Sequence, residues 1–147
     1  MLSLDPWAAA AQSATMEPKL TPPFGGRCLC GAVRYICEGV PLWQAHCHCE
    51  SCRRATSSAF TSFFGMADGT WRWTGEAPAT YASSPGVSRD FCRRCGSPMA
   101  YRSTGFPEEM HFYAASLIDP SNYQPTEHVF IAESVPWIHL TDGLPRR

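Results

Sequence analysis

Seven of the eight cysteines in this chain occur in closely spaced groups, and this spacing narrows the folds open to it more than any other feature. The groups are Cys28-x-Cys30, Cys47-x-Cys49-x-x-Cys52 and Cys92-x-x-Cys95. Cysteines one or two residues apart can turn their sulfurs onto one tetrahedral metal ion. The sequence therefore predicts that these seven thiols bind metal.

The start of the chain bears on the redox state of these thiols. It has no basic residue before Lys19, so the positive start of a secretory signal is missing. Cysteines in a chain without an export signal are expected to stay reduced and to bind metal rather than form disulfides. We therefore expect a cytoplasmic protein.

The spacing indicates two kinds of metal site. Two cysteine pairs that the fold brings together would close a four-sulfur shell, and the natural set is Cys28, Cys30, Cys92 and Cys95. A glycine follows each pair directly, which lets backbone amides approach the sulfurs and hydrogen-bond to them. A closed shell of this kind is typical of a structural zinc ion.

The remaining group, Cys47-x-Cys49-x-x-Cys52, would fill three corners of a tetrahedron and leave the fourth open. An open position is typical of a zinc ion that takes part in a reaction. Cys37, His46 or His48 could instead supply a fourth ligand and make this site structural too. The two histidines alternate with the cysteines, which favours side chains that point away from the metal.

The rest of the chain is typical of one small domain. Its 147 residues suit a single domain, and 44% hydrophobic with 17% charged residues is typical of a globular protein. Residues 1–20, rich in Ala, Ser and Thr, are expected to form a flexible lead-in. Residues 21–147 are expected to form a single zinc domain.

Short runs with a period of two predict a mainly β fold of antiparallel sheets. In residues 32–38, Val33, Tyr35 and Cys37 fall on one face of a predicted strand. Further predicted strands cover residues 42–46, 59–66, 70–75, 79–83, 88–92, 98–103 and 110–117. Asp68-Gly69 indicates a hairpin turn, and a turn or two of helix is expected just after Cys52.

Charge and hydropathy argue against two classes of partner. The formal net charge is −1, whereas nucleic-acid-binding domains are clearly basic. No apolar run reaches the roughly 18–20 residues that a membrane-spanning helix needs. We therefore expect neither a nucleic acid nor a membrane as a partner.

Four motifs, taken together, resemble those of a known family. They are GRCLCGAVRY (26–35), AHCHCESCRRATSSAF (45–60), FCRRCGSPMAYR (91–102) and EHVFIAESVPW (127–137). In this order they are similar to the motifs of the glutathione-dependent formaldehyde-activating enzyme family, to which the centromere protein V domain also belongs. The resemblance runs from about Gly26 to about Pro145. One departure is Ser57, where relatives often carry glycine.

The resemblance implies a fold and a division of the cysteines. The implied fold has twisted antiparallel sheets around a structural zinc ion, similar to the β-tent fold of B-type methionine sulfoxide reductases. Two zinc ions per chain are implied, a structural one at Cys28, Cys30, Cys92 and Cys95 and a reactive one at Cys47, Cys49 and Cys52. The last three cysteines would be the catalytic residues.

The resemblance also implies an activity, that of a carbon–sulfur lyase similar to S-(hydroxymethyl)glutathione synthase. Its partners would be a glutathione-type thiol, held as a thiolate at the open zinc, and formaldehyde or a related aldehyde. Arg53 or Arg54 could bind a carboxylate of glutathione. Aromatic residues could line a cleft, although they more often fill a core; they are Trp43, Phe60, Phe63, Phe64, Trp71, Trp73 and Trp137. The alternative is a non-catalytic module with two zinc ions that binds a thiol or a protein partner.

Overall fold

The computed structural model describes residues 19–147, and this part of the chain is built mainly from short strands. In chain order the strands are β1 (Phe24–Arg27), β2 (Arg34–Cys37), β3 (Trp43–Cys47), β4 (Thr61–Ala67), β5 (Trp71–Trp73), β6 (Ala79–Ser84), β7 (Val87–Phe91), β8 (Pro98–Ser103), β9 (Glu109–Tyr113) and β10 (His128–Val129). The helical elements are α2 (Glu50–Thr56) and the 3-10 turns η1 (Ala114–Ser116) and η2 (Ile131–Glu133). The predicted mainly β fold is confirmed.

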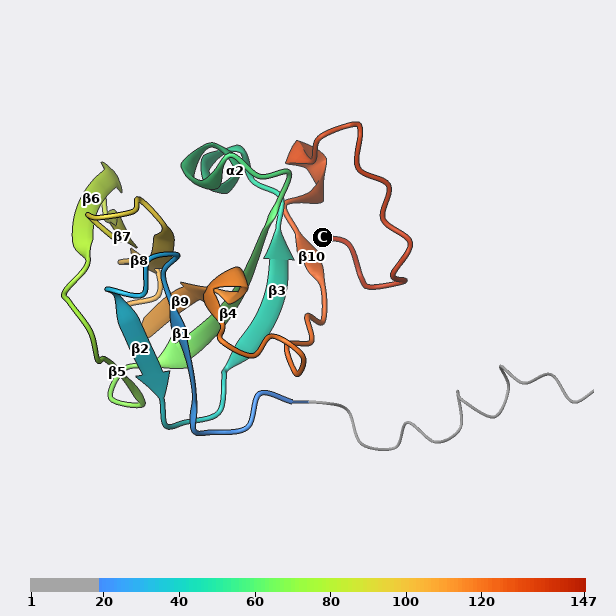
Figure 1. The fold of residues 1–147 in the computed structure, drawn as a ribbon. Coiled ribbons are helices and arrows are strands. Elements are labelled where there is room, and N and C mark those ends of the chain that lie inside the picture. Colours follow the sequence, from blue (N-terminus) through green and yellow to red (C-terminus); the bar gives the residue numbers. More distant parts are fainter. Residues whose placement is uncertain (1–18) are drawn as a thin grey trace, which may run out of the picture.

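The strands form two sheets (Figure 1). The smaller has the order β1-β2-β5, and the larger has the order β10-β3-β4-β9-β8-β7-β6. Neighbouring strands are antiparallel except for β10, which runs parallel to β3. A segment near the end of the chain therefore lies beside the strand that leads into the central cysteine motif.

The predicted strands agree with the observed ones to within a few residues, and the faces of the run at residues 32–38 are as expected. Val33, Tyr35 and Cys37 are all buried. The predicted hairpin at Asp68-Gly69 is wrong, because β5 pairs with β2 rather than with β4. The turn instead carries the chain from the larger sheet to the smaller one, where Trp71 can pack against the main core.

The helix begins earlier than predicted. We expected it just after Cys52, but α2 begins at Glu50 with Cys49 as its N-cap. The Cys49 Sγ accepts a hydrogen bond from the Cys52 N–H at 3.3 Å, a role usually taken by a Ser or Asp oxygen. The helix ends at Thr56, and its C-cap Ser57 has a φ of 52°, in the left-handed region that glycine favours. In the part of the chain that the structure describes, no helix is long and apolar enough to cross a membrane.

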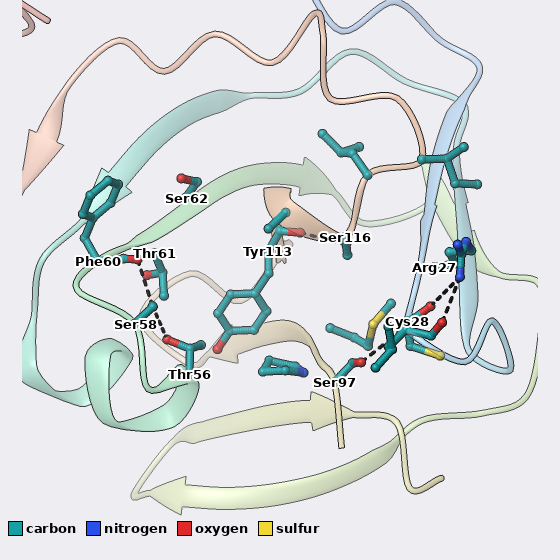
Figure 2. Close-up of a pocket in the computed structure, with 16 residues that line it drawn as sticks. Arg27, Cys28, Thr56, Ser58, Phe60, Thr61, Ser62, Ser97, Tyr113 and Ser116 are labelled. Carbon is teal, nitrogen blue, oxygen red and sulfur yellow. Dashed lines mark hydrogen bonds between the residues drawn. The ribbon is translucent and has the colours of Figure 1, made fainter. Parts of the chain in front are cut away.

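A cavity of about 630 Å³ is lined by residues from β1, α2, β4 and η1 (Figure 2). Much of its lining is hydroxyl-bearing, from Thr56, Ser58, Thr61, Ser62, Ser97, Tyr113 and Ser116. The hydroxyls of Thr56, Ser58 and Ser116 donate to backbone carbonyls two to four residues away. These hydroxyls therefore stabilise the local turns of the chain.

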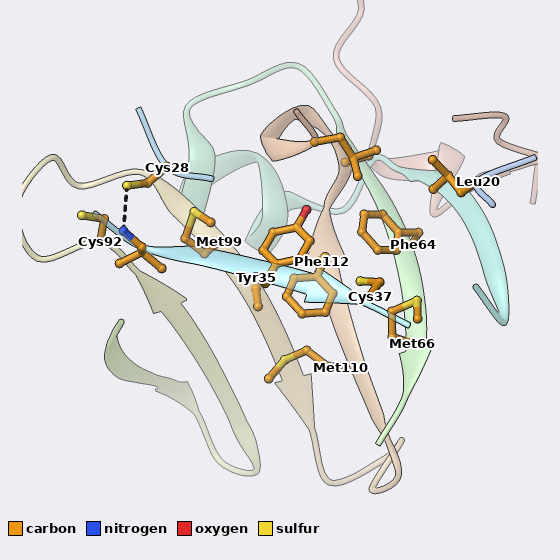
Figure 3. Packing of buried hydrophobic residues seen from close by; sticks show 14 residues of the cluster. Leu20, Cys28, Tyr35, Cys37, Phe64, Met66, Cys92, Met99, Met110 and Phe112 are labelled. Carbon is orange, nitrogen blue, oxygen red and sulfur yellow. Dashed lines mark hydrogen bonds between the residues drawn. The ribbon is translucent and has the colours of Figure 1, made fainter. Parts of the chain in front are cut away.

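The main core combines residues of both sheets (Figure 3). Tyr35 of β2 stacks on Phe112 of β9 with ring centroids 4.2 Å apart, and Phe64 of β4 stacks on Phe112 at 5.5 Å. Cys37 is fully buried in this core, and burial raises the pKa of its thiol to about 12. A neutral thiol in such surroundings behaves as a small apolar side chain.

The predicted lead-in, residues 1–20, lies outside the described residues except for its last two. Leu20, the second of these, is buried in the main core. The folded part of the chain therefore includes at least the end of that segment.

Candidate metal centres and the adjoining cavity

The cysteine pairs at residues 28–30 and 92–95 meet in one cluster. Cys28 and Cys30 follow β1, whereas Cys92 and Cys95 lie in the turn between β7 and β8. The four sulfurs lie within 4.8 Å of one another, with 3.6 Å between Cys28 and Cys30 and 3.8 Å between Cys30 and Cys92. Sulfurs placed about 2.3 Å from an ion at tetrahedral corners are separated by roughly 3.8 Å. The cluster therefore has the dimensions of a tetrahedral site that could bind a metal ion.

The backbone around this cluster is turned toward the sulfurs. The Val33 N–H donates to the Cys28 Sγ at 3.3 Å, a contact that favours the thiolate form. Gly31 and Gly96 have φ of 80° and 77°, so both turns pass through the left-handed region. The glycine after each cysteine pair is therefore required by the turn itself.

Cys47, Cys49 and Cys52 form a second cluster, with sulfurs within 4.8 Å of one another. Cys47 is the last residue of β3, Cys49 caps α2 and Cys52 lies in the first turn of that helix. The three thiols converge because the chain passes from strand to helix within this short motif. No fourth Cys, His, Asp or Glu side chain among residues 19–147 joins them. The cluster could therefore hold a metal ion with one position left for another ligand.

The residues considered as a fourth ligand lie elsewhere. Cys37 is in the main core. The His46 Nδ1 lies 2.8 Å from the Ser62 Oγ, on the face of β3 opposite to Cys47. The buried His48 has its Nε2 2.8 Å from the Nδ1 of His128. Both histidines thus have partners away from the cysteine cluster.

A chain of hydrogen bonds links His48 to the C-terminal segment. The His128 Nε2 lies 2.8 Å from the Asp142 Oδ2. Because a carboxylate only accepts, the His128 Nε2 is the donor in this contact. This hydrogen bond is the main reason why the pKa of Asp142 is lowered. His48, which lies between Cys47 and Cys49, is therefore held in place by the side chain of His128.

Arg89, which belongs to none of the cysteine motifs, lies beside the second cluster. Its side chain is buried, and both terminal nitrogens lie 3.9 Å from the Cys52 Sγ. Nη1 also donates to the Tyr113 hydroxyl at 2.8 Å and Nη2 to the Ser51 hydroxyl at 2.9 Å. The guanidinium lies over the Tyr101 ring, 5.0 Å from its centroid. These contacts hold a permanent positive charge against the thiols.

The electrostatics of this cluster favour a thiolate at Cys49. Its pKa is lowered because the thiols of Cys47 and Cys52 donate hydrogen bonds to its sulfur. The Cys52 N–H and the positive charge of Arg89 act in the same direction. Since the thiolate is the form that binds metal, this environment suits a cation at the cluster.

The second cluster lies in the wall of a cavity of about 670 Å³. Trp43, Ala45 and Cys47 alternate along β3 and all three line it, which is the pattern expected for one face of a strand. Other strands and loops add apolar side chains to the wall, among them Phe63, Tyr101, Phe106, Val129 and Phe130. A reactive group at the cluster would therefore face a largely apolar space.

The predicted partners of a glutathione carboxylate do not line this cavity. Arg53 donates to a backbone carbonyl, and Arg54 forms a surface ion pair with Glu50 at 2.8 Å. The cations in the cavity wall are Arg89 and Arg147. Arg53 and Arg54 lie on α2 beside the cysteine motif, whereas Arg89 approaches the cysteines from β7, which lies far away in the sequence.

The aromatic residues divide between the two roles considered for them. Trp43 and Phe63 line the cavity. Phe64, Trp71 and Trp73 belong to or pack against the main core. Phe63 is also buried, and Trp43 packs against it in a smaller apolar cluster with Cys47 and Cys52.

Trp43 and His111 share one polar partner in this wall, the carboxylate of Glu109. Gly65, the cross-strand partner of Trp43, makes room for the indole, since a Cβ there would collide with it. The indole Nε1 donates to the Glu109 Oε2 at 2.9 Å, and the His111 Nε2 lies 3.0 Å from the same oxygen. Burial lowers the pKa of His111, so its ring is neutral at neutral pH.

Fold and site together define a mainly β protein with two cysteine clusters that could bind metal ions. The sequence profile of the family described as glutathione-dependent formaldehyde-activating enzyme matches residues 23–133. This stretch includes all seven clustered cysteines and Arg89. The chain belongs to this family.

The chain is also similar to individual proteins. A protein of Halomonas elongata, provisionally named a glutathione-dependent formaldehyde-activating enzyme, is 29% identical over 126 residues, which cover 78% of this chain and 79% of the relative. An uncharacterized lyase of Schizosaccharomyces pombe is 35% identical over 85 residues, which cover 56% of this chain and 60% of the relative. A crystal structure of a Rhodobacter sphaeroides protein matches with a TM-score of 0.54 at 26% identity and covers 64% of this chain and 87% of that one.

Proposed function

We propose that this protein is a zinc-dependent carbon–sulfur lyase that joins a glutathione-type thiol to formaldehyde or a related aldehyde. The observation that carries the proposal is the three-cysteine cluster, which has no fourth protein ligand among residues 19–147 and lines a cavity of about 670 Å³. The family and the Halomonas relative are named for glutathione-dependent activation of formaldehyde.

The donor sets of both clusters suit zinc, for which thiolate sulfur is a preferred ligand. We assign a structural role to the four-cysteine cluster and a reactive role to Cys47, Cys49 and Cys52. Zinc bound at the three cysteines would lower the pKa of an incoming thiol and keep it as a nucleophilic thiolate near neutral pH.

The residues of the chain would position the reacting groups. Arg89 offsets the negative charge of the cluster, and the walls at Trp43 and Phe63 exclude water while holding thiol and aldehyde close together. In the reaction a bond forms between sulfur and the carbonyl carbon, and the thiol proton ends on the carbonyl oxygen.

We also infer that residues 21–147 act as one zinc domain in a reducing compartment, the cytoplasm. The four-cysteine cluster joins segments 62 residues apart, Cys30 and Cys92, and so connects the two sheets. Seven thiols that must stay reduced to bind zinc favour such a compartment.

The test combines a zinc count with a rate measurement. Zinc per chain is measured for the wild type and for Cys49→Ser, and exchange between glutathione, formaldehyde and their adduct is followed by NMR. We expect two zinc ions and exchange faster than background for the wild type. Cys49→Ser should keep one zinc ion and show background exchange only, because two thiols hold zinc poorly.

The matched control is Cys37→Ala, which removes a thiol from the core and leaves both clusters intact. It should retain two zinc ions and wild-type exchange, and circular dichroism should show that both variants are folded. Exchange at the background rate in the wild type, together with saturable glutathione binding, would support the non-catalytic alternative instead.

A further inference from the structure

The cavity beside the three cysteines is much larger than formaldehyde requires. Its volume of about 670 Å³ lies in the range of roughly 300–1,000 Å³ that is typical of sites for drug-sized molecules. A one-carbon aldehyde would fill only a small part of it. The remaining space can take a larger body that is attached to the aldehyde or to the thiol.

The wall of this space is a nearly continuous aromatic surface. The ring of His111 lies 4.6 Å from that of Trp43, 5.5 Å from that of Tyr101 and 5.3 Å from that of Phe106. Phe63 continues the surface toward the cysteines, 6.2 Å from Tyr101. Such rings bind apolar and aromatic groups by edge-on and offset contacts.

The charged groups in the same wall already have partners within the described part of the chain. Arg89 is held by Tyr113 and Ser51 as well as by the cysteine cluster. Arg147 contacts the Glu127 carboxylate through two nitrogens, at 2.5 and 2.6 Å. A ligand recognised mainly through its carboxylates would need free cations. The wall therefore favours an apolar body over a charged one.

Phe130 is held in an unfavourable backbone conformation where it lines this cavity. Its φ of 56° and ψ of 41° lie in the left-handed region, which is an outlier for a bulky residue. Burial of the ring does not offset the energetic cost of this backbone conformation, because Phe130 is 58% exposed. Backbone strain of this kind clusters at ligand-contacting positions. Phe106, also part of the lining, is 52% exposed, so two aromatic rings are open to an incoming molecule.

We propose that the site acts on hemithioacetals that carry an aryl or medium-length alkyl body, and that Phe106 and Phe130 enclose this body. The inference rests on the proposed function and names its substrate class. In the forward direction the thiol sulfur bonds to the carbonyl carbon, and the sulfur-bound proton moves to the carbonyl oxygen, so no oxidant or reductant is needed. The apolar body can come from the aldehyde or from the thiol, because the adduct presents the same surface in either case.

The first test compares three thiol–aldehyde pairs by NMR exchange with the zinc-loaded protein. The pairs are glutathione with formaldehyde, glutathione with phenylacetaldehyde, and phenylmethanethiol with formaldehyde. At least one aryl pair should exchange about tenfold more efficiently than glutathione with formaldehyde, the size expected for one enclosed aromatic ring. The faster aryl pair identifies the source of the apolar body.

The deciding variant is Phe130→Asn, because asparagine accepts the left-handed conformation that phenylalanine tolerates poorly. Its thermal stability should equal or exceed that of the wild type, while the ratio of aryl to formaldehyde exchange falls about tenfold. The matched control is Trp137→Asn, which removes an aromatic residue that is 69% exposed and lies outside the cavity lining. An unchanged ratio in Phe130→Asn would overturn the proposal.

A binding measurement separates this proposal from the proposed function. Saturation-transfer NMR compares S-benzylglutathione with S-methylglutathione, neither of which can react. The benzyl compound should bind about tenfold more tightly, and Phe130→Asn should remove that advantage. Equal binding of the two compounds to the wild type would overturn the apolar preference. Absence of catalysis with every aldehyde would contradict the proposed function, and the binding result alone would then decide the preference.

Discussion

Arg89 places a permanent positive charge against a cluster that would otherwise be negative. Three thiolates and a divalent ion carry a net charge of about −1, and the guanidinium 3.9 Å from the Cys52 Sγ offsets it. The planar guanidinium contacts Tyr113, Ser51 and the sulfur at the same time, which an ammonium group cannot match geometrically. Residues around metal ligands commonly hold those ligands in the orientation that the ion needs.

Arg89→Met should therefore weaken metal binding at the three-cysteine cluster about tenfold, the size typical of a lost contact to a metal ligand. Methionine keeps much of the side-chain length but removes the charge and the donors. Competition with a chromophoric zinc chelator measures the change. Arg102→Met, which removes a more exposed guanidinium paired with Asp68, is the control and should bind zinc as the wild type does. Equal affinity in Arg89→Met and the wild type would contradict this role.

Among the elements, β10 connects the C-terminal segment to the cysteine motif. It pairs with β3 so that His128 lies opposite His46 and Val129 opposite Cys47. Beyond the strand, the His48 N–H donates to the Val129 carbonyl at 3.0 Å. A two-residue strand forms few backbone bonds, so the side-chain contacts of His128 with His48 and Asp142 add to its support.

Asp142→Asn should lower stability at neutral pH and have a smaller effect in acid. The hydrogen bond with His128 lowers the pKa of Asp142 below its ordinary value of 3.8 in the folded protein. The ionised carboxylate therefore stabilises the fold above pH 3.8, and this stabilisation disappears as the pH falls through the lowered folded-state pKa. The difference in urea midpoint between wild type and variant, followed across pH, measures the effect.

Asp119→Asn is the matched control, because the pKa of Asp119 is also lowered, in this case by Ser121. For both variants, the difference in urea midpoint from the wild type should become smaller in acid. Asp142→Asn alone should also weaken zinc binding at residues 47–52, since only Asp142 is linked through His128 to His48. A stability difference that does not change with pH would refute the assigned contact.

For the whole molecule, the four-cysteine cluster joins the end of β1 in the smaller sheet to the turn between β7 and β8 in the larger one. The three-cysteine cluster lies within one short strand-to-helix segment. Metal binding that connects distant segments contributes directly to folding free energy. Loss of metal from the four-cysteine cluster should therefore lower the free energy of unfolding much more than loss of metal from the three-cysteine cluster.

Cys95→Ser and Cys49→Ser test this difference, because each removes one partly buried ligand from one cluster. We expect Cys95→Ser to unfold at a markedly lower temperature than Cys49→Ser, with zinc content measured in parallel. The same ranking should appear on stepwise chelation, with activity lost before the fold. Equal unfolding temperatures for the two variants would show that the four-cysteine cluster does not hold the sheets together.

The local pattern predicted most of the elements and much of the candidate site. Alternation placed Tyr35 and Cys37 in the core, and the cysteine spacing predicted which sulfurs share a cluster. The Asp68-Gly69 hairpin failed, because a turn signal indicates a reversal of the chain but not which sheet the next strand joins. The start of α2 was missed because Cys49 takes the capping role usually held by Ser or Asp.

The sequence by itself determined the period-two strands, the two cysteine groupings and the family, because these depend on residues a few positions apart. Only the tertiary structure decided that Arg89 faces Cys52, that His111 lines the cavity and that His128 supports His48. The contact of Arg89 with Cys52 joins residues 37 positions apart, and that of His128 with His48 joins residues 80 positions apart. They follow from the order of strands in the larger sheet, which is set by packing of the whole chain rather than by any local pattern.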